Sequence, residues 1–355
     1  MILINGNFFC RNLTGIERFA WEILKQLDLL LTNEDEIMIL VPANAKIFPD
    51  FVNIKPIISH KEVKSFPIWD MCTFANAVKK YRATALNFSN TAPLGKKCGI
   101  SFLHDIYAKD FPKDFSTFKD KLIRFYSIFQ YKNICKNAKK ILTVSNFSKN
   151  QIQKAFAVSK ERVSVIPNGW EHFKNIQEDD NIFNKFPILK EKKFFFTLGS
   201  LQKRKNLKWI LEYAAKHPQE HFAISGKAIG GMKITELNSL NNLSNVTFLG
   251  YVSDGEVKSL MKKCTAFVFP SYYEGFGIPP LEALSVGAKV IVSDVACLPE
   301  IYKKAAVYIN PSDTDVNLSV LSDTEISTED VSSVLNEYTY QNAAKILYNE
   351  IKADL

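Results

Sequence analysis

Short runs of apolar, β-branched and aromatic residues recur along the chain, separated by stretches with helical periodicity. Nearly continuous apolar runs of this length are typical of parallel strands that are buried on both faces. Their alternation with helical stretches predicts βαβ units and a doubly wound α/β architecture. The predicted strands cover residues 1–5, 36–41, 54–59, 85–89, 100–105, 140–145 and 163–169 in the first half, and 194–200, 222–226, 246–250, 266–271, 289–294 and 305–309 in the second.

The length of the chain favours two domains. A single hydrophobic core rarely grows beyond about 250–300 residues, and this chain has 355. Residues 170–192 lack strand alternation and carry clustered charge, as linkers do. We therefore expect a first domain over 1–169, a linker over 170–192 and a second domain over 193–328. A helical tail over 329–355 is expected to pack back toward the first domain.

Composition and charge indicate which classes of protein this chain can belong to. The hydrophobic fraction of 46% is ordinary for a globular chain, and the net charge of +8 suits an anionic ligand or an anionic membrane surface. No nucleic-acid-binding motif is present. None of the six cysteines forms a C-x-x-C pair, no basic leader precedes the first strand, and no apolar run reaches the ~20 residues of a membrane span. We expect a cytoplasmic protein, with peripheral association with the inner face of the cell membrane left open.

Residues 265–294, TAFVFPSYYEGFGIPPLEALSVGAKVIVSD, concentrate the candidate chemistry. A buried strand leads into the loop EGFG, and Pro279–Pro280 then predict a helix start. The predicted helix covers 281–286, with Gly287 as its left-handed end and a further strand after it. Ligands of open α/β sheets bind at the carboxyl ends of the strands, which is where this loop would lie.

The loop and helix offer groups that suit a sugar linked to a diphosphate. Glu274 is predicted at the end of the strand and Glu282 in the first turn of the helix. A carboxylate can accept two hydroxyl hydrogen bonds, and the backbone at Gly275 and Gly277 can approach a ligand closely. The positive end of a helix favours a diphosphate. A loop that merely caps its helix, with exposed acids, remains the alternative on these grounds.

The spacing of the two glutamates carries a family resemblance. Glu274 and Glu282 within EGFGIPPLEALSVG resemble the E-x7-E signature of the family 4-like retaining glycosyltransferases, a large family with many members in bacterial polysaccharide biosynthesis. The resemblance implies the GT-B fold, in which two Rossmann-like domains face each other across a cleft. Other segments resemble the same family in the same order: TGIERFAWEIL (14–24), FLHDI (102–106), TVSNFSK (143–149), VIPNG (165–169), TLGSLQKRKNL (197–207), FLGYVSDGEV (248–257), LPEIY (298–302) and INPSD (309–313).

The resemblance implies roles around the donor diphosphate. Arg204 and Lys205 would hold the diphosphate and stabilise the leaving group, and Gly15 would let the amino-terminal loop approach it. Glu282 would take the ribose hydroxyls. The competing interpretation of the basic triplet that begins at Lys203 is an ordinary solvated face.

Further roles concern the sugar and the base. Glu274, with the backbone of Phe276 and Gly277, would hold hydroxyls of the donor sugar, and His104 would lie near the reacting sugar. His104 could equally be a satisfied core histidine. Two residues after a predicted strand would line the base pocket: Tyr251 and Val252.

The implied activity is transfer, with retention, of a hexose or N-acetylhexosamine from a UDP- or GDP-linked donor to a glycan or lipid-linked glycan acceptor. The acceptor would belong to O-antigen, capsule or lipopolysaccharide assembly. No D-x-D-type motif stands where a metal would be needed, so we expect no metal and no cofactor besides the donor substrate. Retention would arise from attack on the departing side, assisted by a diphosphate oxygen, and nucleic acid is not an expected partner.

Three alternatives are weighed against this activity. A nucleotide-sugar epimerase or a sugar phosphorylase could share the architecture. A dinucleotide-dependent oxidoreductase would need G-x-G-x-x-G after the first strand, where the chain has NGNFFCRNLTG instead. A non-catalytic sugar-nucleotide-binding homologue would not need the full set of charged candidates.

Residues 111–140 combine aromatic and basic side chains. Five apolar residues recur at helical spacings, which places them on one face: Phe111, Phe115, Phe118, Leu122 and Phe125. The basic residues are Lys113, Lys119, Lys121, Arg124, Lys132, Lys136, Lys139 and Lys140, against Asp114 and Asp120. The pattern suits the surface of an anionic bilayer, with packing into the first domain as the alternative.

Overall fold

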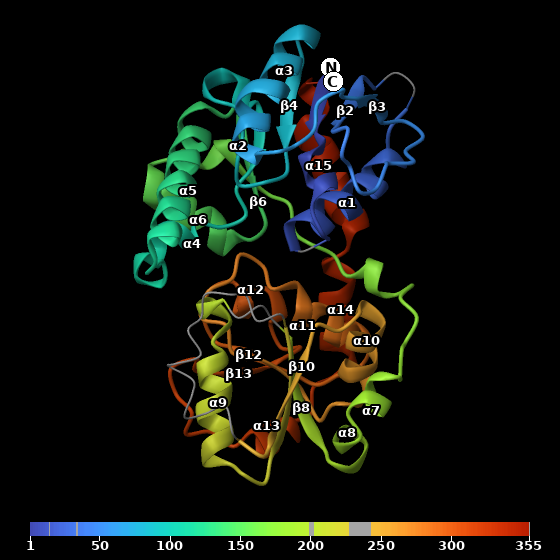
Figure 1. Ribbon diagram of the computed structural model, residues 1–355, viewed down its shortest axis with the longest axis vertical. Helices are drawn as coiled ribbons and strands as arrows, with labels where there is room; N and C mark the ends of the chain where they lie inside the picture. Colours follow the sequence, from blue (N-terminus) through green and yellow to red (C-terminus); the bar gives the residue numbers. More distant parts are fainter. Residues whose placement is uncertain (14, 33–34, 199–201, 227–242, 355) are drawn as a thin grey trace. The chain divides into compact units, whose positions relative to one another are not determined.

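The structure is a computed structural model that describes residues 1–13, 15–32, 35–198, 202–226 and 243–354 (Figure 1). Contacts divide the chain into two compact units, which are described separately. Every predicted strand coincides with an observed one.

Unit 1 comprises Met1–Gly169 and Tyr338–Leu355 and is built on a parallel seven-stranded sheet. The strand order is β3-β2-β1-β4-β5-β6-β7, so the chain winds outward from β1 in both directions. Such a sheet has its switch point between β1 and β4, at the carboxyl ends of the strands. The strands are β1 (Ile2–Asn5), β2 (Ile37–Val41), β3 (Lys55–Ile58), β4 (Thr84–Asn87), β5 (Ile100–Phe102), β6 (Lys140–Thr143) and β7 (Val163–Val165).

The helices of unit 1 cover this sheet, and two of the longer ones begin at side-chain caps. Thr117 and Asp120 form a capping box at the start of α5, and Ser145 accepts a hydrogen bond from the Ser148 backbone at the start of α6. The helices are α1 (Gly15–Asp28), α2 (Phe66–Ile68), α3 (Ala75–Tyr81), α4 (Tyr107–Asp110), α5 (Phe118–Asn137), α6 (Asn146–Phe156) and α15 (Tyr340–Ile351).

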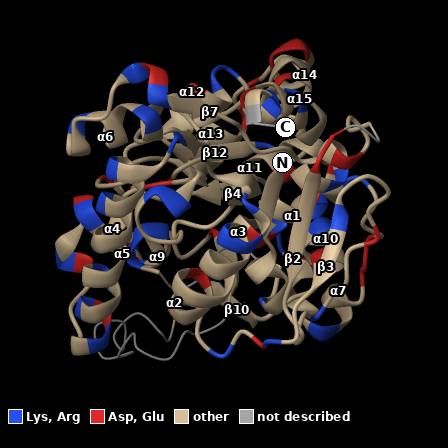
Figure 2. Cartoon of the chain, turned by 90° about the horizontal axis from the view of Figure 1, so that it is seen from above, with Lys and Arg blue, Asp and Glu red and all other residues tan. Residues whose placement is uncertain are grey.

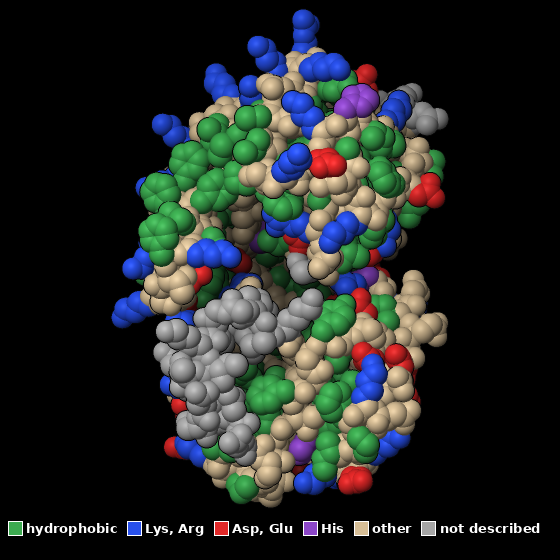
Figure 3. Space-filling model, in the orientation of Figure 1, with side chains coloured by type: hydrophobic (Ala, Val, Ile, Leu, Met, Phe, Trp, Pro, Cys, Tyr) green, Lys and Arg blue, Asp and Glu red, His purple; other side chains and the backbone are tan. Residues whose placement is uncertain are grey.

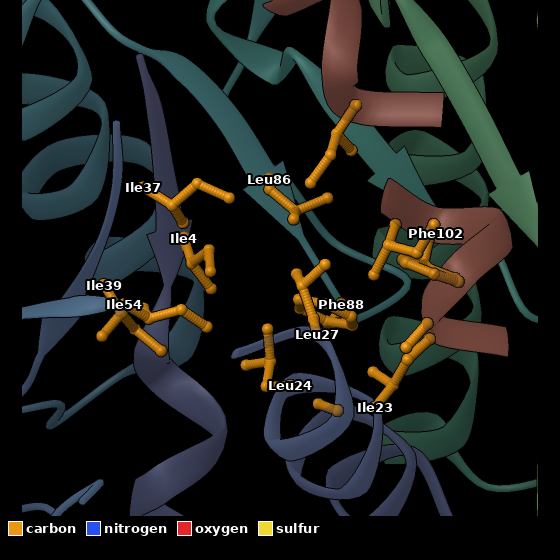
Figure 4. Packing of buried hydrophobic residues seen from close by; sticks show 14 of the residues in the cluster. Ile4, Ile23, Leu24, Leu27, Ile37, Ile39, Ile54, Leu86, Phe88 and Phe102 are labelled. Carbon is orange, nitrogen blue, oxygen red and sulfur yellow. The ribbon is translucent and has the colours of Figure 1, made fainter. Parts of the chain in front are cut away.

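The main core of unit 1 lies between the sheet and α1. Figure 4 shows Ile23, Leu24 and Leu27 of α1 gathered against Ile4 and Leu86 of the central strands. The last helix, α15, packs beside α1 (Figure 1). It buries Ala343, Ala344, Leu347 and Ile351 in the same core. This burial explains why the end of the chain returns to the unit in which the chain began.

Unit 2, Trp170–Glu337, is built on a parallel six-stranded sheet in the order β10-β9-β8-β11-β12-β13. Its switch point lies between β8 and β11. The strands are β8 (Phe194–Leu198), β9 (His221–Ser225), β10 (Val246–Gly250), β11 (Phe267–Phe269), β12 (Val290–Ser293) and β13 (Val307–Ile309). Its helices are α7 (Ile182–Lys185), α8 (Ile188–Glu191), α9 (Leu207–Lys216), α10 (Asp254–Lys263), α11 (Ile278–Ser285), α12 (Leu298–Tyr302), α13 (Leu318–Ser322) and α14 (Thr328–Glu337).

The segment expected as a linker, 170–192, groups with unit 2 by its contacts. Lys258 of α10 donates to the carbonyl oxygens of Phe173, Lys174 and Ile176 at 2.8–3.2 Å. Other residues of the segment are buried: Ile182, Phe183 and Leu189. Charged side chains of the segment also pair with α10, where Lys185 contacts Glu256, Glu178 contacts Lys262 and Asp180 contacts Lys263.

The expected tail over 329–355 is divided between the two units. Helix α14 ends at Glu337 and belongs to unit 2, where Val334 is buried. Helix α15 belongs to unit 1. The division falls at the residues between the helices, where Thr339 caps α15 by accepting a hydrogen bond from the Asn342 backbone.

We predict that Lys258→Ala destabilises the protein by about 1.5–3 kcal/mol, the usual contribution of hydrogen bonds to a charged donor. The matched control is Lys262→Ala in the same helix, which removes an exposed ion pair with Glu178 and should cost less than about 0.5 kcal/mol. Urea unfolding of the three proteins measures both values. Equal effects of the two substitutions would contradict the role given to Lys258.

Candidate functional site

The residues that carry the candidate chemistry of unit 2 gather at its switch point. The one-turn helix Lys203–Lys205 follows β8, and the loop with Glu274 follows the neighbouring strand β11. Asn206, in the left-handed conformation, ties the loops of this edge together. Its side-chain amide donates to the carbonyl oxygens of Pro270 at 3.0 Å and Pro311 at 2.8 Å. The sequence analysis missed Asn206, because its two partners are 64 and 105 residues away.

Glu274 lies between the two predicted diphosphate-binding cations. Its Oε1 is 2.8 Å from Lys205 Nζ, and its Oε2 is 3.8 Å from an Arg204 Nη atom. Burial alone would raise the pKa of Glu274, but the two cations outweigh it and hold that pKa below its ordinary value. Burial lowers the pKa of Lys205, against the opposing pull of Glu274. The three side chains together carry one net positive charge when all are ionised, which suits an anionic ligand.

The helix after the loop begins earlier than predicted. Helix α11 starts at Ile278 instead of residue 281, so the proline pair lies inside its first turn. Glu282 is consequently in the second turn, and the expectation that it stands in the first is wrong. The error comes from placing the prolines before the helix, whereas a proline is tolerated within the first turn. Gly287 follows the helix with φ +78°, as predicted.

Glu282 has a partner that the sequence analysis did not consider. His172 Nε2 donates to Glu282 Oε1 at 2.7 Å, and both side chains are largely buried. His172 lies in the segment that Lys258 holds against α10, one residue before Phe173. Since the two residues are 110 positions apart and His172 stands in a stretch without strand pattern, nothing in the sequence indicated this pair.

The residues predicted to line the base pocket follow β10 directly. Tyr251 is 76% exposed, whereas Val252 is buried. Gly250 before them has φ +67°, so the chain turns sharply at the end of this edge strand. Residues 199–201 and 227–242 lie outside the described part of the chain.

Two predicted site residues belong to unit 1. Gly15 is the first residue of α1, and a Cβ atom added there would meet no described atom within 4 Å. The packing of unit 1 therefore does not itself require glycine at this position. His104 follows β5 and is buried beside Phe19 and Phe102, with ring centroids 5.3 and 5.5 Å away.

The imidazole of His104 is neutral at pH 7. Burial lowers its pKa below the ordinary value, despite the hydrogen bond to the Phe88 carbonyl oxygen. That bond, at 2.7 Å, requires the proton to be on Nε2, because a carbonyl oxygen only accepts. The ring thus has the packing of a core histidine while standing at the carboxyl end of a central strand.

Comparison with known proteins decides the family. Residues 13–172 match the family described as Glycosyltransferase Family 4, and residues 178–322 match the family described as Glycosyl transferases group 1. The chain belongs to these two-domain glycosyltransferases. Together the matches cover most of both units, as the ordered motifs predicted.

Individual relatives agree with this assignment. The chain is 29% identical to the O-antigen chain mannosyltransferase RfbU of Salmonella typhimurium over 266 residues, which is 73% of this chain and 70% of the relative. Its fold is similar to that of sucrose-phosphate synthase from Thermosynechococcus elongatus, with a TM-score of 0.72 at 15% identity over 99% of this chain and 98% of that one. It is also similar to Alr3699/HepE of Anabaena, solved in complex with UDP-glucose, with a TM-score of 0.68 at 16% identity over 99% of each chain. The GT-B prediction is thereby confirmed.

Proposed function

We propose that this glycosyltransferase moves a hexose, with mannose as the first candidate, from a nucleotide-linked donor to a growing polysaccharide of the O-antigen or lipopolysaccharide type. The observation that carries the proposal is the charged trio Arg204, Lys205 and Glu274 at the switch point, with Glu282 in the adjoining helix. The name of the Salmonella relative supports the choice of mannose and of an O-antigen acceptor. UDP and GDP both remain candidate carriers.

The arrangement of Arg204, Lys205 and Glu274 suggests how the donor binds. Glu274 neutralises part of the charge of Lys205 and Arg204, so these partly buried cations are paired. A diphosphate brings negative charge to the same cations, and Glu274 can then accept hydrogen bonds from sugar hydroxyls. Breaking the anomeric bond increases the charge on the diphosphate, and fixed cations at that position lower the barrier.

Glu282 is proposed to bind the ribose through the oxygen that His172 does not engage. The bond from His172 to Oε1 at 2.7 Å would fix the orientation of the carboxylate before the nucleotide arrives. His172 would then be a positioning residue and Glu282 a ligand-binding one. Retention is proposed to follow attack by the acceptor on the departing side, because both glutamates are assigned to donor hydroxyls and neither to the reacting carbon.

We predict that Glu282→Gln and Lys205→Met each lower transfer at least about tenfold without unfolding the protein, because each removes a charged contact to the donor. Lys203→Met is the matched control, since Lys203 stands in the same basic triplet but is exposed. The assay follows nucleoside diphosphate release from GDP-mannose, UDP-glucose, UDP-galactose and UDP-N-acetylglucosamine, with and without glycan acceptors. Near-normal turnover in Glu282→Gln or Lys205→Met would refute the donor site, and a changed donor formed without acceptor would point to an epimerase.

We predict that the new glycosidic bond keeps the anomeric configuration of the donor and forms without added metal. The reason is that cations of the chain itself are assigned to the leaving diphosphate, where other enzymes use a metal ion. NMR of the isolated product determines the configuration, and parallel reactions in EDTA and in manganese test the metal. An inverted linkage would contradict the predicted retention. Activity that is lost in EDTA and restored by manganese would contradict the predicted independence of metal.

A peripheral membrane contact through α5 is proposed as part of this function. Of the five residues expected on one face, only Phe118, Leu122 and Phe125 are well exposed, at 78, 55 and 74%. Phe111 and Phe115 instead pack around Tyr107, so the expected face is shorter than predicted. Phe129, one turn beyond Phe125, extends the exposed row.

Basic side chains border this apolar row. Figure 3 shows hydrophobic side chains over α5 with Lys and Arg around them, and Figure 2 shows the basic residues along the same helix. Lys119, Lys121 and Lys132 are exposed, whereas Arg124 donates to the Ala108 carbonyl oxygen at 2.9 Å. Within the described residues, no helix is both long and apolar enough to cross a membrane. The combination suits the surface of an anionic bilayer.

We predict that the protein floats with liposomes containing anionic lipid at low salt and is released at high salt. Lys119→Glu with Lys121→Glu should abolish flotation, because each lysine near the surface contributes about 1 kcal/mol. Phe118→Ser with Phe125→Ser should weaken it, whereas Leu29→Ser with Val52→Ser, at exposed apolar positions elsewhere in unit 1, should not. Unmodified protein that stays at the bottom of the gradient at low salt would refute the contact.

A further inference from the structure

Two buried side chains stand directly behind the loop Glu274–Gly277. Tyr302 is the last residue of α12, and Cys297 is the residue before its first. Neither side chain is exposed to solvent. The Tyr302 hydroxyl donates to the carbonyl oxygen of Gly277, and Cys297 Sγ donates to that of Phe276 at 3.2 Å. Both ends of this short helix are therefore bonded to the backbone of the loop.

The contact between α12 and the loop is close and specific. Gly277 has φ +86°, a conformation that favours glycine, and an added Cβ would lie 2.9 Å from Leu298 Cδ2. Burial raises the pKa of Tyr302 well above its ordinary value, so the phenol keeps the proton that it donates. The position of the loop against α12 therefore depends on Gly277 in the loop and on the hydrogen bonds that Tyr302 and Cys297 donate to it.

Holding a carbonyl oxygen also fixes the N–H group of the next residue. The peptide unit is planar and trans, so its C=O and N–H bonds point in opposite directions. The N–H groups of Gly277 and Ile278 are therefore directed away from Cys297 and Tyr302. Ile278 is the first residue of α11, and the first N–H groups of a helix have no acceptor inside it.

We propose that Tyr302 and Cys297 are positioning residues, which aim the N–H groups of Ile278 and Gly277 at oxygen atoms of the donor. This inference rests on the proposed function, since it deepens the account of the same donor site. Neither side chain touches substrate. They act by preventing rotation of the two peptide planes, so that the donor meets N–H groups that are already oriented.

The kinetic test compares Tyr302→Phe, which removes only the hydroxyl, with Tyr308→Phe. Tyr308 lies in the same unit, and its hydroxyl donates at 2.6 Å to the Lys303 carbonyl oxygen, which is not part of the loop Glu274–Gly277. With the donor identified by nucleoside diphosphate release, Tyr302→Phe should lower kcat about two- to tenfold, the range for one neutral hydrogen bond. Cys297→Ala should act in the same direction, and Cys297→Ser, which keeps a donor, should restore most of the rate.

A second measurement tests the positioning without any turnover. Protein labelled with 15N-glycine and 15N-isoleucine reports the amide signals of Gly277 and Ile278, which respond to hydrogen bonds at the preceding carbonyl group. Tyr302→Phe should move the Ile278 signal and Cys297→Ala the Gly277 signal, whereas Tyr308→Phe should move neither.

The outcomes separate this inference from the proposed function. Unmoved signals, or equal loss of rate in Tyr302→Phe and Tyr308→Phe, would overturn the positioning role. An unmodified protein that releases nucleoside diphosphate from no donor would overturn the proposed function, while the amide signals would still support or refute the orientation of the two peptide planes.

Discussion

The buried ion pair between Glu274 and Lys205 is the interaction on which the site of unit 2 depends. It joins the loops that follow β8 and β11, the two strands between which the sheet reverses its winding. Glu274 is buried whereas Lys205 keeps 17% of its side chain exposed, so the carboxylate depends on the pair more than the ammonium group does. The pair therefore fixes the spacing of the two loops before any ligand binds, and the charge of Arg204 at its edge leaves the trio net positive.

Beside the ion pair, several neutral side chains at this edge donate hydrogen bonds to backbone carbonyl groups. Asn206 holds the carbonyl oxygens of Pro270 and Pro311, and Tyr302 holds that of Gly277. In the proposed donor site the loop presents N–H groups to the ligand, so its carbonyl groups face the protein and need donors where they are buried. Neutral donors satisfy these carbonyl groups without changing the net charge of the site. That charge is set by the cations and the glutamates.

The sequence predicted what depends on local pattern and missed what depends on long-range contact. The strands could be found because burial on both faces leaves apolar runs, as in Phe194–Leu198. Glu274, Lys205 and Glu282 could be found because family motifs surround them. His172 could not, since its contact with Glu282 spans 110 residues. The assignment of 170–192 to unit 2 was equally hidden, because a polar segment held by the ammonium group of Lys258 has the composition of a free linker.

The two units differ in the charge of their candidate residues. Unit 2 contributes the cations and both glutamates, whereas His104 of unit 1 is neutral and has its Nε2 proton committed to the Phe88 carbonyl oxygen. Burial lowers the pKa of His104, so protonating the ring would work against the packing of Phe19 and Phe102 around it. The cations proposed to stabilise a leaving diphosphate, Arg204 and Lys205, both belong to unit 2. For the proposed place of His104 near the sugar, a lowered pKa and a committed Nε2 proton suit a role in orienting the sugar ring better than one in transferring protons.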